Sequence, residues 1–383
     1  MCRNLEREDI LMLRKKLAAF LAVAVVAVGV VGCGGGNEPA STNGNANTET
    51  PEETPDTPEE TPEETPDTPE ETPEETPDTP EESGDAAPSG GTIKVGVINN
   101  DPNESGYRTA NDRDMKEMFT EANGYEASFA YSLKNDEQIT AAQTMIQNGV
   151  DYLLLSAADT AGWDSVLQDA NDQGIRVILF DRVVDADENL YEAAIISDMP
   201  AEGQRAVDWL AGQNLDEYNI IHIQGVMGSS PQQGRSGALD EKVAAEDNWN
   251  IVAQQTAEWN AEKAQQIVQS VIDSGEKFNV IYAENDDMAK GAVAALDAAN
   301  ISHGVDGDVV IMGFDCNTWA LEEVLAGNWN YDGQCNPYQA KYIDEVIKKL
   351  ESGGTVEEKT IYLEEKGFEA GTITQADIDE NGI

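Results

Sequence analysis

Polar side chains that can form paired hydrogen bonds stand where short apolar runs of the sequence end. They are carboxylates, guanidinium groups, amides and one indole: Asp181, Arg182, Arg235, Trp259, Asn285, Asp315 and Gln334. Such groups bind neighbouring hydroxyls in planar, two-point geometry, and an indole face covers apolar C–H groups. The chemistry that this set favours is recognition of a small polyhydroxylated molecule.

Groups for covalent or metal chemistry are scarce in the sequence. The two histidines, His222 and His303, lie far apart and lack the spacing of a metal site or a Ser-His-Asp triad. The polar set contains no activated nucleophile, and no glycine-rich phosphate fingerprint occurs. We therefore expect no enzyme, no metal and no cofactor. Residues 377–382 imitate the start of a calcium-binding loop but stop before its bidentate glutamate, so we expect a frayed polar C-terminus there.

The same polar residues also have structural interpretations. Asp181 and Arg182 could form an ion pair that caps a helix, and Trp259 could be an interlobe packing residue. One of Asn285 and Asp286 is expected to cap the helix that follows. A shared site explains polar groups at five strand ends better than five separate structural roles do.

Two series of alternating strands and helices must position these residues. In the first we predict strands at 92–99, 125–132, 150–156 and 175–180, with helices at 107–123, 136–148 and 162–173. In the second we predict strands at 219–224, 250–256, 278–283, 308–313 and 328–334, with helices at 200–212, 231–246, 260–274, 286–300, 318–326 and 338–351. Repeated βαβ units with nearly continuous apolar strands are typical of parallel sheets covered by helices on both faces. We expect two doubly wound α/β lobes that bind a ligand beyond the carboxyl ends of their strands.

Four strings in fixed order carry a resemblance to a known family. They are Ile178–Arg182, Gln224–Val226 followed by Arg235, Ala283–Met288 and Gly313–Asp315. From about Thr92 to its C-terminus the chain resembles the type I periplasmic-binding-protein family of pentose and hexose carriers. The resemblance implies ligand contacts at Glu104, Tyr107, Arg108, Asp181, Arg182, Arg235, Trp259, Asn285, Asp315 and Gln334.

The resemblance also implies a domain plan with a three-strand hinge. Its first lobe would span 92–198, completed by 335–362, its second lobe would span 199–334, and a C-terminal segment would occupy 363–383. The crossings are expected near Asp198, near 334–335 and near 361–363. Cys316 and Cys335, beside predicted contact residues, could form a disulfide or remain two buried thiols.

The family resemblance implies a monomeric, extracytoplasmic substrate-binding protein of a carbohydrate ABC importer, which captures a monosaccharide and delivers it to a membrane permease. Residues 103–108 and 161–163 are similar to the galactofuranose-binding branch, whereas 111–114 and 185–187 are similar to the xylose-binding branch. The galactofuranose branch has an acid where Gln334 aligns, so the sugar stays open between a galactose or galactofuranose type and a xylose type. The alternative function is a sugar-sensing receptor component that signals to a membrane sensor.

Residues 1–32 have the pattern of a signal peptide. A basic cluster at 14–16 precedes an apolar run at 17–31, which is short for a transmembrane span and ends in small residues. The ending resembles a bacterial lipoprotein signal, in which Cys33 is lipidated and becomes the mature N-terminus; the alternative is an uncleaved anchor helix. We expect the protein on the outer face of the cytoplasmic membrane, at the cell surface or in the periplasm.

Residues 33–91 are predicted to be a disordered tether. Three copies of an 11-residue Thr/Pro/Glu-rich unit run from Thr50 to Glu82. Proline and like charges favour an extended chain over a packed core, although a recognition repeat is the alternative interpretation. The net charge of the whole chain is −51, which repels phosphate and excludes nucleic acid as an expected partner.

Overall fold

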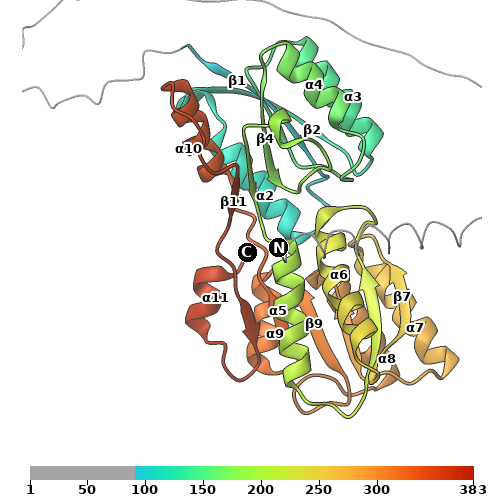
Figure 1. Ribbon diagram of the computed structural model, residues 1–383. Helices are drawn as coiled ribbons and strands as arrows, with labels where there is room; N and C mark the ends of the chain where they lie inside the picture. Colours follow the sequence, from blue (N-terminus) through green and yellow to red (C-terminus); the bar gives the residue numbers. More distant parts are fainter. Residues whose placement is uncertain (1–90) are drawn as a thin grey trace, which may run out of the picture. The chain divides into compact units, whose positions relative to one another are not determined.

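The computed structural model describes residues 91–383, which form one compact unit (Figure 1). The predicted signal peptide 1–32, the lipidated Cys33 and nearly all of the predicted tether lie outside the described residues and stay predictions. Among residues 91–383, no helix combines the length and apolar character needed to cross a bilayer.

The first lobe is built on a six-stranded parallel sheet with the strand order β11-β5-β4-β3-β1-β2. Its strands are β1 (Ile93–Asn99), β2 (Tyr125–Tyr131), β3 (Tyr152–Leu155), β4 (Arg176–Asp181), β5 (Ala193–Ile196) and β11 (Thr360–Tyr362). Its helices are α2 (Gly106–Met118), α3 (Asn135–Gln147), α4 (Asp164–Asp172) and α10 (Ala340–Glu351).

Alternate residues of each first-lobe strand enter separate cores. Ile178 and Phe180 of β4 pack in the core that α2 and α10 cover, whereas Val177 and Leu179 pack in the core that α3 and α4 cover. Successive side chains of a strand point to opposite faces, so a strand buried on both faces is apolar throughout. This is the reason for the continuous apolar runs of the sequence.

The second lobe has the sheet order β12-β10-β9-β8-β6-β7, in which only β12 runs antiparallel to its neighbour. Its strands are β6 (Tyr218–Gln224), β7 (Trp249–Thr256), β8 (Val280–Ala283), β9 (Val310–Phe314), β10 (Tyr331–Gly333) and β12 (Gly367–Glu369). Its helices are α5 (Met199–Gly212), α6 (Ser230–Ala245), α7 (Ala261–Ser274), α8 (Asp286–Ala299), α9 (Thr318–Ala326) and α11 (Gln375–Asn381). Helices α5 and α6 cover one face, and α7, α8, α9 and α11 cover the other.

The chain passes between the two sheets three times. It leaves the first sheet after β5, returns after β10 at 334–339, and crosses again between β11 and β12 at 363–366. The segment after 363 therefore adds β12 to the second sheet and α11 to the second lobe.

The prediction of a frayed C-terminus is wrong. Thr374 and Asp377 form a reciprocal capping box at the start of α11, and Ile378 is buried in the second-lobe core. The last residue, Ile383, exchanges backbone hydrogen bonds with Cys316 and Thr318. A capped helix with one apolar anchor holds this polar segment in place.

One predicted helix is also divided. The segment predicted as a helix at 107–123 is α2 followed by a separate 3₁₀ turn at Glu121–Asn123. The backbone has an extended conformation at Thr120, and Gly124 adopts a left-handed φ of 90°. Only glycine adopts that conformation without steric cost, so the turn ends there.

Candidate ligand-binding site

A cavity lies between the lobes, at the carboxyl ends of the strands. Nine of the ten predicted contact residues line it: Glu104, Tyr107, Arg108, Asp181, Arg182, Arg235, Trp259, Asn285 and Asp315. Ser105, Met199, Pro231 and Cys335 complete the lining. The strand ends of both sheets thus meet at one place, as the sequence predicted.

The lobes touch one another beside the cavity. The backbone N–H of Gly106, at the start of α2, donates to Asp287 of α8 at 3.2 Å. The N–H of Thr160 donates to the carbonyl of Gly228 at 3.2 Å. A Cβ atom at position 106 would lie only 1.9 Å from Asn317 of the other lobe, so this approach requires glycine. The structure therefore has the lobes closed against each other.

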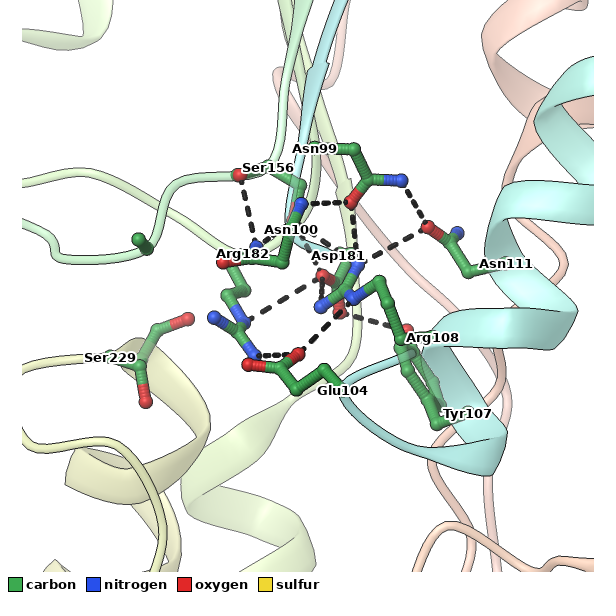
Figure 2. Close-up of polar contacts among 12 residues, drawn as sticks. Asn99, Asn100, Glu104, Tyr107, Arg108, Asn111, Ser156, Asp181, Arg182 and Ser229 are labelled. Atoms are coloured by element: carbon green, nitrogen blue, oxygen red, sulfur yellow. Dashed lines mark hydrogen bonds and ion pairs between the residues drawn. The ribbon is translucent and has the colours of Figure 1, made fainter. Parts of the chain in front are cut away.

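Asp181 is the centre of the first-lobe half of the site (Figure 2). Its carboxylate, at the end of β4, accepts hydrogen bonds from the Tyr107 hydroxyl at 2.8 Å and the Ser156 hydroxyl at 2.6 Å. The Arg108 guanidinium lies 2.7 Å from the same carboxylate. Burial by itself would raise the pKa of Asp181, but Arg108 and Arg182 outweigh it and the pKa is lowered. Asp181 is thus held as a carboxylate.

Arg108 is fixed by a network that the sequence analysis missed. Its Nη1 donates to Asn99 at 2.8 Å and to Asn111 at 3.2 Å, and both asparagines are fully buried. Asn99 and Ser156 are the last residues of two predicted strands, so the rule that selected the other strand-end residues would have found them. These contacts position Arg108 and Asp181 and leave little freedom to either.

Glu104 and Arg182 keep unused hydrogen-bonding atoms at the cavity. Arg182 Nη2 donates to Glu104 Oε2 at 3.2 Å, as Figure 2 shows. Within residues 91–383, Glu104 Oε1 and Arg182 Nε and Nη1 have no hydrogen-bond partner, and both side chains are less than 5% exposed. Buried polar atoms of this kind are costly unless a partner is supplied. They suit a ligand that brings its own donors and acceptors.

Arg235 of α6 is the main cation of the second-lobe half. Glu202 of α5 lies 2.9 Å from its Nε and 2.8 Å from its Nη2. Asp315, which follows β9, lies 3.6 Å from the same Nη2. Burial raises the pKa of Asp315 well above its usual range, against the opposing effect of Arg235. Asp315 can therefore donate a hydrogen bond to a ligand as well as accept one.

Trp259 forms an indole wall that rests on the backbone of Gly225. A Cβ atom at position 225 would lie 1.9 Å from the indole, so only glycine leaves room for it. The indole N–H has no partner among the described residues, and the Arg182 guanidinium lies 5.9 Å from the ring centroid. The wall presents an aromatic face and one free donor.

Asn285 has the capping role that the sequence allowed for. Its Oδ1 accepts from the Met288 N–H at 2.9 Å at the start of α8, which confirms that one residue of the Asn285–Asp286 pair caps this helix. Capping fixes the side chain while it lines the cavity.

Three residues at the cavity have strained backbones. Asp181, Trp259 and Asp315 have φ values of 59°, 62° and 112°, in the region that favours glycine. Such conformations cost free energy and concentrate where ligands are clamped. Here each of them turns a polar or aromatic side chain out of a strand end toward the cavity.

The structure does not place Gln334 at the cavity, and its predicted ligand contact stays a prediction. Its side chain bonds Asn381 of α11 at 3.3 Å, and the neighbouring Cys335 faces the cavity instead. Successive side chains of an extended chain alternate in direction, so a shift of one residue exchanges the two. Cys316 and Cys335 are both buried as free thiols.

Comparisons with known proteins agree with this geometry. A family model described as a periplasmic binding protein domain matches residues 95–355. The fructose import binding protein FruE of Bifidobacterium longum is 31% identical over 299 residues, covering 76% of this chain and 88% of that protein. The galactofuranose-binding protein YtfQ of Escherichia coli is 28% identical and covers 68% and 85%. A Mycobacterium smegmatis protein solved with β-D-fucofuranose has 32% identity and a TM-score of 0.68, and the match covers 75% and 93%.

Proposed function

The chain belongs to the periplasmic binding protein domain family, and from this premise we propose that it captures one monosaccharide between its two lobes for a carbohydrate ABC importer. One observation carries the proposal: an interlobe cavity is lined by an indole and by buried donors and acceptors that have no partner among residues 91–383. Sugar hydroxyls would supply those partners, and the apolar face of a sugar ring would lie on Trp259.

The charges at the cavity favour a neutral ligand. Three guanidinium groups line it, and each is paired with a buried carboxylate: Arg108 with Asp181, Arg182 with Glu104, and Arg235 with Glu202. Because these groups are paired with one another, an added carboxylate or phosphate on the ligand would leave a buried charge without compensation. The site is suited to binding, and we propose no catalytic role for it.

We further propose that the sugar is bound as a furanose. Two of the similar proteins are described with a galactofuranose and a fucofuranose, and the third is described as importing fructose, a sugar that readily forms a five-membered ring. This favours the galactofuranose-like expectation over the xylose-like one.

The family premise extends to location and partners. We propose that Cys33 carries the lipid anchor, that residues 34–90 tether the lobes to the outer face of the membrane, and that a single chain delivers its sugar to a permease. Sugar binding would favour the closed state. Residues of both lobes contact the ligand only in that state, so the closed state binds the sugar more tightly than the open state does.

The test is a sugar panel on the chain from residue 34 onward, assayed by thermal shift and calorimetry. D-Fructose, D-galactose, L-arabinose, D-ribose and D-xylose are the candidates, and D-galacturonate is the charged control for galactose. We expect one furanose-forming sugar to raise the melting temperature with one site per chain, and galacturonate to have no effect. If no neutral sugar stabilises the protein, the proposed function is wrong.

A further inference from the structure

The three crossings between the lobes meet at one buried carboxyl group, that of Glu365. Its Oε1 accepts from the Ser197 hydroxyl at 2.5 Å, just after β5, and from the Asn336 N–H at 2.7 Å, just after β10. Glu365 itself lies on the third crossing, and its side chain is 2% exposed. One side chain thus joins all three segments on which a relative movement of the lobes depends.

A second buried carboxyl group, that of Glu202, faces Glu365. One oxygen of each lies with Cys335 Sγ in a group whose members are all within 4.8 Å of one another. Glu202 Oε2 is paired with Arg235, but Glu202 Oε1 has no hydrogen-bond donor among the described residues. Two buried carboxylates this close repel each other, whereas one proton between them supplies the missing donor.

The neighbouring charges place that proton on Glu365. Burial raises the pKa of Glu202 as well, but its ion pair with Arg235 opposes that rise, whereas Arg205, the cation beside Glu365, lies 4.0 Å away. Burial, and next to it the charge of Glu202, raises the pKa of Glu365 to about 9. Burial also raises the pKa of Cys335, which keeps this thiol neutral. Asp315 is the other acid near Glu202 and already faces Arg235.

A metal ion in place of the proton fits the group less well. A cation bound to Glu202 would compete with Arg235 for the same carboxylate. It would also require Cys335 as a thiolate, against the direction in which burial moves that pKa. The proton leaves every neighbouring contact as it is.

We propose that Glu365 is a positioning residue whose proton, shared with Glu202, couples the three hinge crossings to Arg235 at the ligand cavity. The part that concerns Arg235 rests on the proposed sugar site; the shared proton does not. In this arrangement the hinge holds Glu202, and Glu202 orients the Arg235 guanidinium toward the ligand. Loss of the proton places two negative charges at the hinge. Glu202 then no longer holds the Arg235 guanidinium in its orientation toward the ligand.

The first experiment needs no ligand. Urea unfolding of the wild type, Glu365→Gln and the exposed control Glu364→Gln is measured from pH 5 to pH 9.5. The pKa of Glu365 is raised from 4.5 to about 9. The contribution of its proton to the free energy of unfolding is therefore complete below pH 4.5 and is lost as the pH rises toward 9. Between these values the folding constant of the wild type and the control should fall by up to about tenfold per pH unit relative to Glu365→Gln. Parallel curves for all three proteins would overturn the shared proton.

The second experiment measures sugar affinity at pH 7 and pH 9.5, with D-fructose, D-galactose and L-arabinose as probes. At pH 9.5 roughly a quarter of wild-type molecules keep the proton, so their dissociation constant should rise about fourfold. Glu365→Gln should keep its pH 7 affinity, because the amide donates to Glu202 at every pH. A pH-independent wild-type affinity overturns the coupling to Arg235, and this result stands even if the variant does not fold.

The outcomes separate the possible failures. If no probe binds any variant, the proposed function fails while the unfolding curves still decide the shared proton. If Zn²⁺ raises the melting temperature of the wild type but not of Glu365→Gln, the group binds a cation and the proposal is wrong.

Discussion

Neutralising Asp181 should separate its structural role from its binding role. Asp181→Asn keeps the side-chain volume and tolerates the left-handed φ of 59°. It removes the negative charge 2.7 Å from Arg108 and one acceptor for the Tyr107 and Ser156 hydroxyls. The variant therefore tests the charge rather than the shape.

The loss of stability can be estimated from these contacts. Removing one partner of a buried ion pair typically costs about 3–5 kcal/mol. Arg108 keeps its bonds to two asparagines and Glu104 at 3.4 Å as a second counter-charge, so we expect about 3 kcal/mol at pH 7. Because the pKa of Asp181 is lowered from 3.8, the difference from wild type should be complete above that pH and shrink as the pH falls through the lowered value.

The assays are urea unfolding for stability and calorimetry for binding. Sugar affinity should fall about 10- to 100-fold, the effect of losing a charged hydrogen-bond acceptor. Asp169→Ala, on an exposed part of α4, is the control and should change stability by less than about 0.5 kcal/mol. A loss below about 1 kcal/mol for Asp181→Asn, with unchanged affinity, would refute the reasoning.

Two further predictions concern the second lobe. Gly225→Ala should weaken sugar binding by about tenfold or more, because its Cβ would displace the Trp259 indole. Gly237→Ala, in open space on α6, is the control and should not alter affinity; equal affinities would contradict the indole wall. Asp332→Asn should flatten the pH dependence of stability. Burial raises the pKa of the facing Asp286 and Asp332 above 3.8, so wild-type stability should fall by up to about 1.4 kcal/mol per pH unit above that value relative to the variant. Identical urea profiles would contradict the raised pKa values of this pair.

The amino-acid pattern by itself determined the two lobes and most of the candidate site. Continuous apolar strands that alternate with amphipathic helices have few arrangements other than helix-covered parallel sheets. Because such strands all end at one edge, polar residues at strand ends converge without any knowledge of the tertiary contacts. This is why residues as distant as Asp181 and Asp315 could be placed together.

The tertiary structure alone decided what lies at the crossings and at the end of the chain. Strand β10, which leads into Gln334, has only three residues, too few to show a period of two. Without that period the sequence could not tell whether Gln334 or Cys335 faces the cavity. The meeting of Glu202 with Glu365 depends on three crossings that bring distant segments together, and no local pattern encodes a contact between carboxyl groups that repel each other unless a proton is shared.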